Sequence, residues 1–212
     1  MSNKGKFITF EGGAGVGKST QVNLLYQKII AKGVKCQLTR EPGGSPGAEE
    51  IRERLVKGGT EKWHPMTEAL LHNAARAEHL EQTVLPAIES GTWVISDRYV
   101  DSTLAYQGYG QGVDVERLLK LHEISTSNYW PDVTIVLDGQ ELNRALEREE
   151  ENTDKEDRYE RMGAEFHKKL QESFLDIARK HPERCIVVSA KGTIDEVASR
   201  IWQAIAPKLE LL

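Results

Sequence analysis

Cysteine is scarce in this chain: only Cys36 and Cys185 occur among the 212 residues, and neither has a partner at Cys-x-x-Cys spacing. This scarcity excludes a small scaffold built on disulfides, and no cluster of Cys and His residues has zinc-ligand spacing. Both cysteines lie inside apolar, strand-like runs. We therefore expect buried free thiols in a protein of a reducing compartment.

Long apolar runs are missing as well. No stretch approaches the roughly 18 apolar residues that a membrane-spanning helix requires. The first ten residues, MSNKGKFITF, lack the apolar core of a secretion signal. We expect a cytoplasmic protein with no membrane partner.

An excess of positive charge is also absent. The formal net charge is −5, so no overall basic field favours nucleic acid or an anionic surface, and we expect neither as a partner. Hydrophobic residues make up 39% of the chain, and no repeat or low-complexity linker divides it. The sequence therefore fits a single domain spanning residues 1–212 with a sizeable core.

A glycine-rich motif near the N-terminus carries the most specific chemistry. Residues 7–20 read FITFEGGAGVGKST, with the full G-x-x-x-x-G-K-[ST] spacing between a strand-like run and a helical pattern. Glycines let backbone N–H groups curl toward an anion, and the helix adds the positive end of its dipole. In this pattern the lysine reaches the β- and γ-phosphates and the hydroxyl ligates Mg²⁺. The motif predicts a nucleoside triphosphate site made of Gly12, Gly13, Ala14, Gly15, Val16, Gly17, Lys18, Ser19 and Thr20.

Apolar, β-branched runs alternate with helical patterns along the whole chain. Near-continuous apolar strands separated by helices are typical of a parallel sheet covered on both faces. We predict an α/β fold of the P-loop NTPase type, with three layers and a central five-stranded parallel sheet flanked by helices. Strands are expected at 6–11, 34–39, 92–96, 132–138 and 184–189, and helices near 18–32, 46–57, 65–90, 113–127, 140–151, 158–181 and 193–206.

Polar groups follow three of the predicted strands, and ligands of such sheets bind beyond the carboxyl ends of the strands. The second strand runs into Arg40 and Glu41, and the third runs into Asp97 and Arg98. A carboxylate after the strand beside a P-loop can organise Mg²⁺, and an arginine can hold a phosphate in a forked grip. A solvated turn and a strand-capping pair are the alternatives. Lys191, after the last strand, lies either against a nucleobase or in a simple turn.

Two further segments carry groups suited to a planar ligand. Residues 101–110, DSTLAYQGYG, place hydroxyls, an amide and aromatic rings in a glycine-bounded turn, which suits a nucleobase. The alternative is a capped helix with core tyrosines. In the helical segment 65–90, His72 and Arg76 share one face because they are four residues apart. Glu78 and His79 are expected on the solvated surface.

The most charged stretch covers residues 147–161, EREEENTDKEDRYER. One interpretation is a solvated helix with paired charges, and the other is a lid that closes over phosphates and excludes water. Phosphoryl transfer requires cations around the moving group. Arg148, Lys155 and Arg158 are the cations of this stretch that can serve.

Taken together, these segments resemble the bacterial thymidylate kinase family over nearly the whole chain. The matching pieces are FEGGAGVGKST, TREPGGSPGAE, AAR at 74–76, SDRYVDSTLAYQG, PDVTIVLD, ALER at 145–148 and DRYE at 157–160. The resemblance implies a P-loop kinase that passes the γ-phosphoryl of ATP to dTMP with Mg²⁺. It also implies a homodimer.

The resemblance implies roles for individual residues. Lys18 would hold the ATP phosphates, Asp97 would organise Mg²⁺ or the acceptor phosphate, and Arg98 would grip that phosphate. Arg76 would hydrogen-bond the thymine carbonyl, and Tyr106 would crowd the sugar C2′ and so favour deoxyribose. The remaining implied contacts are Arg148 beside the adenine, Ser102, Thr103 and Gln107 along the base pocket, His72 at the base-stacking position, Arg40 and Glu41 on the acceptor side, and Asp157 and Glu160 on its lid side.

Three features depart from the family pattern. The family usually has an acidic residue at the position of Ala14, facing the sugar 3′-hydroxyl, and phenylalanine at the position of His72. It also supplies a catalytic arginine from the P-loop or the lid, yet residues 149–152 read EEEN, so Lys155 or Arg158 would have to substitute. The alternatives are a kinase of another nucleoside monophosphate and a weakly active nucleotide-binding regulatory protein. No Asn-Lys-x-Asp guanine-reading motif supports a P-loop switch.

Overall fold

A parallel sheet forms the centre of the molecule. The computed structural model describes residues 4–139, 159 and 162–209. Five strands lie in the order β2-β3-β1-β4-β5, and every neighbouring pair is parallel. Their bounds are β1 (Phe7–Glu11), β2 (Cys36–Arg40), β3 (Trp93–Asp97), β4 (Val133–Asp138) and β5 (Cys185–Ser189). All five residues of β1 are buried, as a central strand covered on both faces requires.

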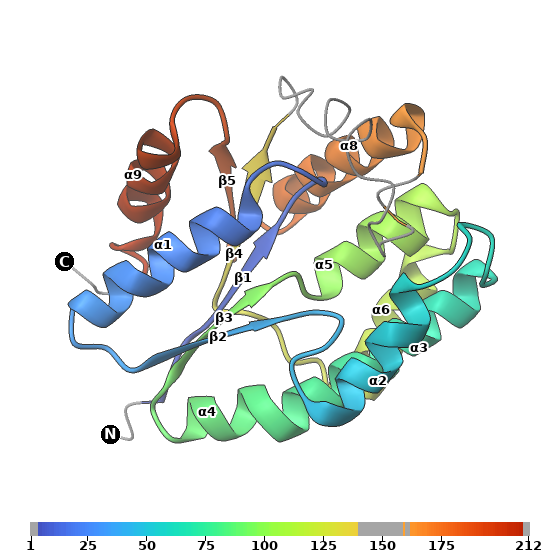
Figure 1. Ribbon diagram of the computed structural model, residues 1–212, viewed down its shortest axis with the longest axis horizontal. Helices are drawn as coiled ribbons and strands as arrows, with labels where there is room; N and C mark the ends of the chain where they lie inside the picture. Colours follow the sequence, from blue (N-terminus) through green and yellow to red (C-terminus); the bar gives the residue numbers. More distant parts are fainter. Residues whose placement is uncertain (1–3, 140–158, 160–161, 210–212) are drawn as a thin grey trace.

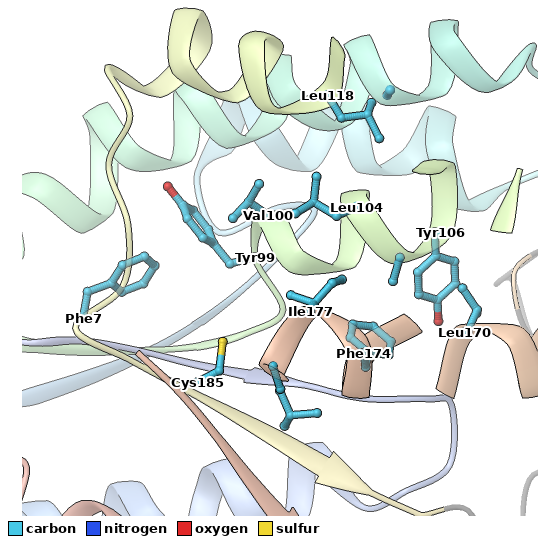
Figure 2. Close-up of a cluster of buried hydrophobic side chains, with 14 of the residues drawn as sticks. Phe7, Tyr99, Val100, Leu104, Tyr106, Leu118, Leu170, Phe174, Ile177 and Cys185 are labelled. Atoms are coloured by element: carbon cyan, nitrogen blue, oxygen red, sulfur yellow. The ribbon is translucent and has the colours of Figure 1, made fainter. Parts of the chain in front are cut away.

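Helices cover both faces of the sheet, so the predicted three-layer α/β fold is confirmed (Figure 1). One apolar cluster joins the sheet to α1 (Lys18–Ala31) and α9 (Ile194–Ile205). A second cluster, which Figure 2 shows in part, includes Phe7, Tyr99, Leu118 and Phe174 on the other face. The helical elements of that side are α2 (Pro46–Val56), α3 (Pro65–His79), η1 (Leu80–Val84), α4 (Leu85–Glu89), α5 (Val100–Thr103), η2 (Leu104–Gly110), α6 (Val115–Thr126) and α8 (Ala164–Lys180).

The helix predicted over 65–90 changes its hydrogen-bonding pattern midway. The chain stays helical from Pro65 to Glu89, but η1 has π-helical geometry. Pro86, the second residue of α4, has no N–H to donate, so a regular α-helical hydrogen-bond ladder cannot run unbroken through this point. The predicted helix over 158–181 begins only at Ala164, because Gly163 is its N-cap with extended backbone. The helix expected over 140–151 lies outside the described residues.

The segment after β3 is helical, so the predicted glycine-bounded turn over 101–110 is wrong. Helix α5 leads directly into the π-helical η2, with Tyr99 fully buried and Tyr106 7% exposed. The side chains of Thr103 and Gln107 therefore project from a helix rather than from a loop. π-Helical turns are frequent at functional sites, where they re-aim side chains.

The two cysteines are free thiols. Cys185 is buried, but Cys36 on the edge strand β2 is only half-buried, so the prediction of two buried cysteines is half correct. Burial raises the pKa of each thiol to about 12, which keeps both protonated and unreactive near neutral pH. Among the described helices, none is both long and apolar enough to cross a membrane.

Candidate functional site

A cavity of about 380 Å³ opens at the carboxyl edge of the sheet. Its walls come from the P-loop, the loop after β2, α3, the end of β3, α5 and η2. It brings together many of the predicted site residues, namely Ala14, Gly15, Gly17, Lys18, Ser19, Thr20, Arg40, Glu41, His72, Arg76, Asp97, Arg98, Ser102, Thr103, Tyr106 and Gln107.

Other predicted residues are not part of this lining. Gly12, Gly13, Val16 and Lys191 lie outside the cavity wall. Arg148, Lys155, Asp157, Arg158 and Glu160 lie outside the described residues, and so does the predicted lid apart from Tyr159.

The P-loop curls around the Lys18 ammonium. Lys18 is buried, and its Nζ donates to the carbonyl oxygens of Gly12 at 3.1 Å and Gly13 at 2.6 Å. Gly12 has a φ of 137°, and a Cβ added there would lie 2.7 Å from the Leu137 carbonyl oxygen. Only glycine fits that turn. Helix α1 begins at Lys18 with no acidic residue in its first turn, so its N-terminus can bind an anion.

Ser19 and Asp97 meet across the P-loop. The Ser19 hydroxyl donates to Asp97 Oδ2 at 2.9 Å. Asp97 Oδ1 is buried and has no hydrogen-bond partner in the described part of the chain. Within those same residues, no three His, Cys, Asp or Glu side chains cluster as a metal site. One carboxylate with one hydroxyl fits Mg²⁺, which usually takes few protein ligands and completes its shell with water and substrate phosphates.

Arg98 spans the gap between the P-loop and η2. Its Nη1 donates to the Gly12 carbonyl oxygen at 3.3 Å and to Ser102 Oγ at 3.0 Å, and its Nη2 donates to the Tyr106 hydroxyl at 3.1 Å. The guanidinium also lies over the Tyr106 ring, 5.2 Å from the centroid. The backbone of Arg98 has a φ of 75°, an uncommon conformation for a residue with a Cβ. This backbone conformation, directly after β3, places the Arg98 side chain in the cavity wall.

The buried carboxyl group of Glu11 accepts hydrogen bonds from the chain segment that carries Arg98. Glu11, at the end of β1, accepts from the backbone N–H of Tyr99 at 2.8 Å and from the Ser102 hydroxyl at 2.6 Å. Burial, together with the nearby charge of Asp101, raises the pKa of Glu11 to about 8, although the Arg98 charge and these hydrogen bonds act in the opposite direction. Sequence reasoning missed Glu11. The sequence feature that could have identified Glu11 is an acidic residue at the end of an otherwise apolar run.

Arg76 belongs to a buried polar network. Its Nε donates to Glu41 Oε2 at 2.8 Å, and its Nη2 donates to Thr103 Oγ1 at 3.0 Å. His79 Nδ1 lies 2.9 Å from Glu41 Oε1, and the other ring nitrogen lies 2.7 Å from Thr39 Oγ1. The surface position predicted for His79 is therefore wrong, since its side chain is fully buried, whereas Glu78 is partly exposed. His79 and Arg76 are three residues apart, so both reach Glu41 from one face of α3.

Three aromatic side chains gather at one side of the cavity. His72 Nε2 lies 2.9 Å from the Tyr159 hydroxyl, and the Tyr159 ring meets Tyr106 edge-on with centroids 5.5 Å apart. Tyr159 lies inside the DRYE motif but is not among the predicted site residues. Arg52 was also missed: it lines the cavity and donates to the Pro42 carbonyl oxygen at 2.7 Å.

The chain is similar to known proteins over nearly its whole length. A family model described as "Thymidylate kinase" matches residues 10–201. A thymidylate kinase of Rhizorhabdus wittichii is 43% identical over 205 residues, covering 97% of this chain and 99% of the relative, and one of Magnetococcus marinus is 43% identical over 202 residues, covering 95% and 96%. A crystal structure of thymidylate kinase from Ehrlichia chaffeensis superposes with a TM-score of 0.75 at 32% identity, covering 95% of this chain and 98% of the other. The chain belongs to the thymidylate kinase family.

Proposed function

We propose that this protein transfers the γ-phosphoryl group of ATP to dTMP, giving ADP and dTDP. The observation that carries this proposal is the continuity of one cavity. It joins the P-loop residues Lys18 and Ser19 to the buried polar groups Arg76 and Gln107, with Arg98 between them. A triphosphate on the P-loop and a monophosphate nucleotide beside α3 would therefore meet at Arg98.

The reaction needs no nucleophile from the protein. An oxygen of the acceptor phosphate attacks the γ-phosphorus, a new P–O bond forms, and the bond to the β–γ bridging oxygen breaks as ADP leaves. Catalysis is then a matter of positioning and charge stabilisation. Lys18 neutralises the donor phosphates, and Arg98 holds the acceptor phosphate. Lys155 or Arg158 remains the proposed lid cation, with Arg148 beside the adenine.

The residues around Asp97 fit Mg²⁺. The unpartnered Asp97 Oδ1 and the Ser19 hydroxyl supply the hard oxygen ligands that this ion prefers. When bound, Mg²⁺ neutralises charge on the phosphate oxygens. Asp97 and Ser19 hold their positions through the hydrogen bond between them.

The acceptor base is proposed to lie between α3 and η2. Arg76 can only donate hydrogen bonds, and it is turned toward Thr103 on α5. Glu41 fixes that orientation from the opposite side. His72 packs near Tyr159 and Tyr106 on the same wall, which suits a stacked ring and a crowded sugar. Ser102 and Arg40 complete the acceptor side.

We also propose a homodimer. Leu70 on α3 is 50% exposed and Ile124 on α6 is 82% exposed. The two helices pack against each other, so their outer apolar side chains offer one surface for a second copy. Sedimentation velocity tests this proposal: we expect the wild type to sediment as a dimer and Ile124→Glu as a monomer, and a monomeric wild type would contradict it.

The free thiols Cys36 and Cys185 support a cytoplasmic location.

The function is tested by ATP consumption, coupled to ADP detection, with dTMP, dUMP, dCMP, dGMP, dAMP and UMP offered separately. We expect dTMP to give the highest kcat/KM. Preference for another nucleoside monophosphate would leave the proposed mechanism intact and change only the proposed substrate. ATP binding without acceptor-dependent turnover would instead indicate a regulatory nucleotide binder.

A further inference from the structure

Glu68 is a fully buried carboxylate on α3 that lies behind the cavity wall rather than in it. Its Oε1 accepts two amide hydrogen bonds, from Gln107 Nε2 at 2.6 Å and from Gln111 Nε2 at 3.2 Å. Both glutamines belong to η2 or follow it directly, four residues apart, so they reach Glu68 from one side. Burying a carboxylate here would be costly without such donors.

This contact determines which way the Gln107 amide points. A carboxylate accepts hydrogen bonds, so the amide must turn its NH₂ group toward Glu68 and its carbonyl oxygen away. Gln107 is 1% exposed and lines the cavity, and its Oε1 has no hydrogen-bond partner in the part of the chain that the structure describes. A buried acceptor without a partner is costly, so a ligand that brought a hydrogen-bond donor within reach of this oxygen would gain from the contact.

The neighbouring group on the same wall has the opposite character. Arg76 supplies only N–H donors, and its Nη2 is tied to Thr103, one helical turn before Gln107. Side chains one turn apart lie roughly 5–6 Å from each other. The wall thus presents a donor beside an acceptor. Thymine and uracil match it with the O4 carbonyl and the N3–H, whereas cytosine offers the N4 amino group and a bare N3 and matches at neither position.

We infer that Glu68 is a positioning residue for base selection: it holds the Gln107 amide with its carbonyl oxygen toward the base, and so favours pyrimidine-2,4-diones over cytosine. This inference rests on the proposed function. Glu68 does not line the cavity, so it would act on the base only through Gln107.

The test is the ratio of kcat/KM for dTMP to kcat/KM for dCMP. In Glu68→Gln the new side chain can offer either an oxygen or an NH₂, so the Gln107 amide is free to turn over. We expect the ratio to fall at least about tenfold, because a site built to hydrogen-bond one edge then loses its discrimination. The ratio of dTMP to dUMP should stay unchanged, since both bases share that edge. Gln111→Leu is the matched control: it removes the other donor to Glu68 and should leave both ratios as in wild type.

A purely structural role for Glu68 predicts a different pattern. It would lower activity on dTMP and dCMP by the same factor, and an unchanged ratio in Glu68→Gln overturns the inference. In a Gln107→Leu background, Glu68→Gln should not change the ratio further; an additional loss there would also contradict action through Gln107.

Folding of each variant is checked by circular dichroism. If Glu68→Gln does not fold, Glu68→Asp keeps the charge and withdraws it by one methylene, and it should lower the ratio as well. Gln107→Leu alone must lower the ratio, and a wild-type ratio there overturns the inference even if no Glu68 variant folds. Absence of dTMP turnover in the wild type would refute the proposed function itself, whereas wild-type turnover with an unaltered ratio in Glu68→Gln refutes only the role of Glu68.

Discussion

The Ser19 hydroxyl donates to the Asp97 carboxylate over 2.9 Å, which joins the first turn of α1 to the end of β3. The two residues are 78 positions apart in the chain. The other carboxylate oxygen of Asp97, Oδ1, is buried and has no hydrogen-bond partner among the described residues. A hydroxyl and a carboxylate held this way are oxygen ligands of the kind that Mg²⁺ prefers, and in the proposed complex nucleotide phosphates and water would supply the other ligands.

Asp97→Asn removes the charge of that site and keeps its shape. We expect kcat to fall by roughly 10²-fold or more, as for loss of other preorganised electrostatic groups. The Mg²⁺ concentration at half-maximal rate should rise as well. Ser19→Thr is the control, because the motif accepts either hydroxyl and the variant should stay near wild type. An unaltered Mg²⁺ titration in Asp97→Asn would contradict the assignment.

Lys18→Ala removes the ammonium at the centre of the P-loop. We expect transfer to drop by roughly 10³-fold, since phosphoryl transfer depends on positioned cations. Circular dichroism should show an intact fold. Lys35→Ala, an exposed lysine between α1 and β2, controls for the loss of one positive charge. Wild-type turnover in a folded Lys18→Ala protein would end the P-loop assignment.

Arg98→Ala should raise KM for dTMP far more than KM for ATP. The guanidinium lies between the P-loop carbonyl of Gly12 and the Tyr106 hydroxyl, where we propose that the acceptor phosphate binds. Charge-assisted hydrogen bonds contribute about 1.5–3 kcal/mol each, so KM should rise about 10- to 100-fold. Arg98→Lys keeps the positive charge but lacks the forked guanidinium, so its KM for dTMP should lie between those of the wild type and Arg98→Ala. Initial-rate kinetics with each nucleotide varied in turn measures both constants, and a larger effect on ATP would refute the assignment.

Glu11 should make stability depend on pH. Its pKa is raised from 4.5 to about 8 by burial and by Asp101, against the opposing effect of Arg98, Ser102 and Tyr99. Between these two values the unfolded chain has lost a proton that the native state retains, so the free energy of unfolding falls as pH rises. Glu11→Gln should flatten this decline. Urea unfolding at about pH 5 and about pH 8 measures it, and exposed Glu123→Gln should keep the wild-type slope. A wild-type slope in Glu11→Gln would show that another group is responsible.

Local patterns predicted most of the fold and many of the residues that line the cavity. The P-loop spacing needs only consecutive residues, because backbone N–H groups of one turn bind the anion. Asp97 and Arg98 were found because carboxyl ends of parallel strands share one edge. His79 was misplaced, since helical periodicity says which residues share a face but not that Glu41 from another element will be there to satisfy a buried imidazole. Residues 101–110 were interpreted as a turn because of their glycines, which disfavour a helix; the burial of Leu104 and Tyr106 in the core, which the local pattern does not show, stabilises the helical form.

The sequence by itself determined a parallel α/β architecture, the glycine-rich P-loop turn and a resemblance to one kinase family. These properties depend on periodicity, composition and short spacing, which act over a few residues. The tertiary structure alone decided the strand order, the raised pKa of Glu11, the network of Glu41 with Arg76 and His79, and the amide orientation that Glu68 imposes on Gln107. Each of these depends on distances and burial between segments far apart in the chain, where a change of about 1 Å makes or breaks a hydrogen bond.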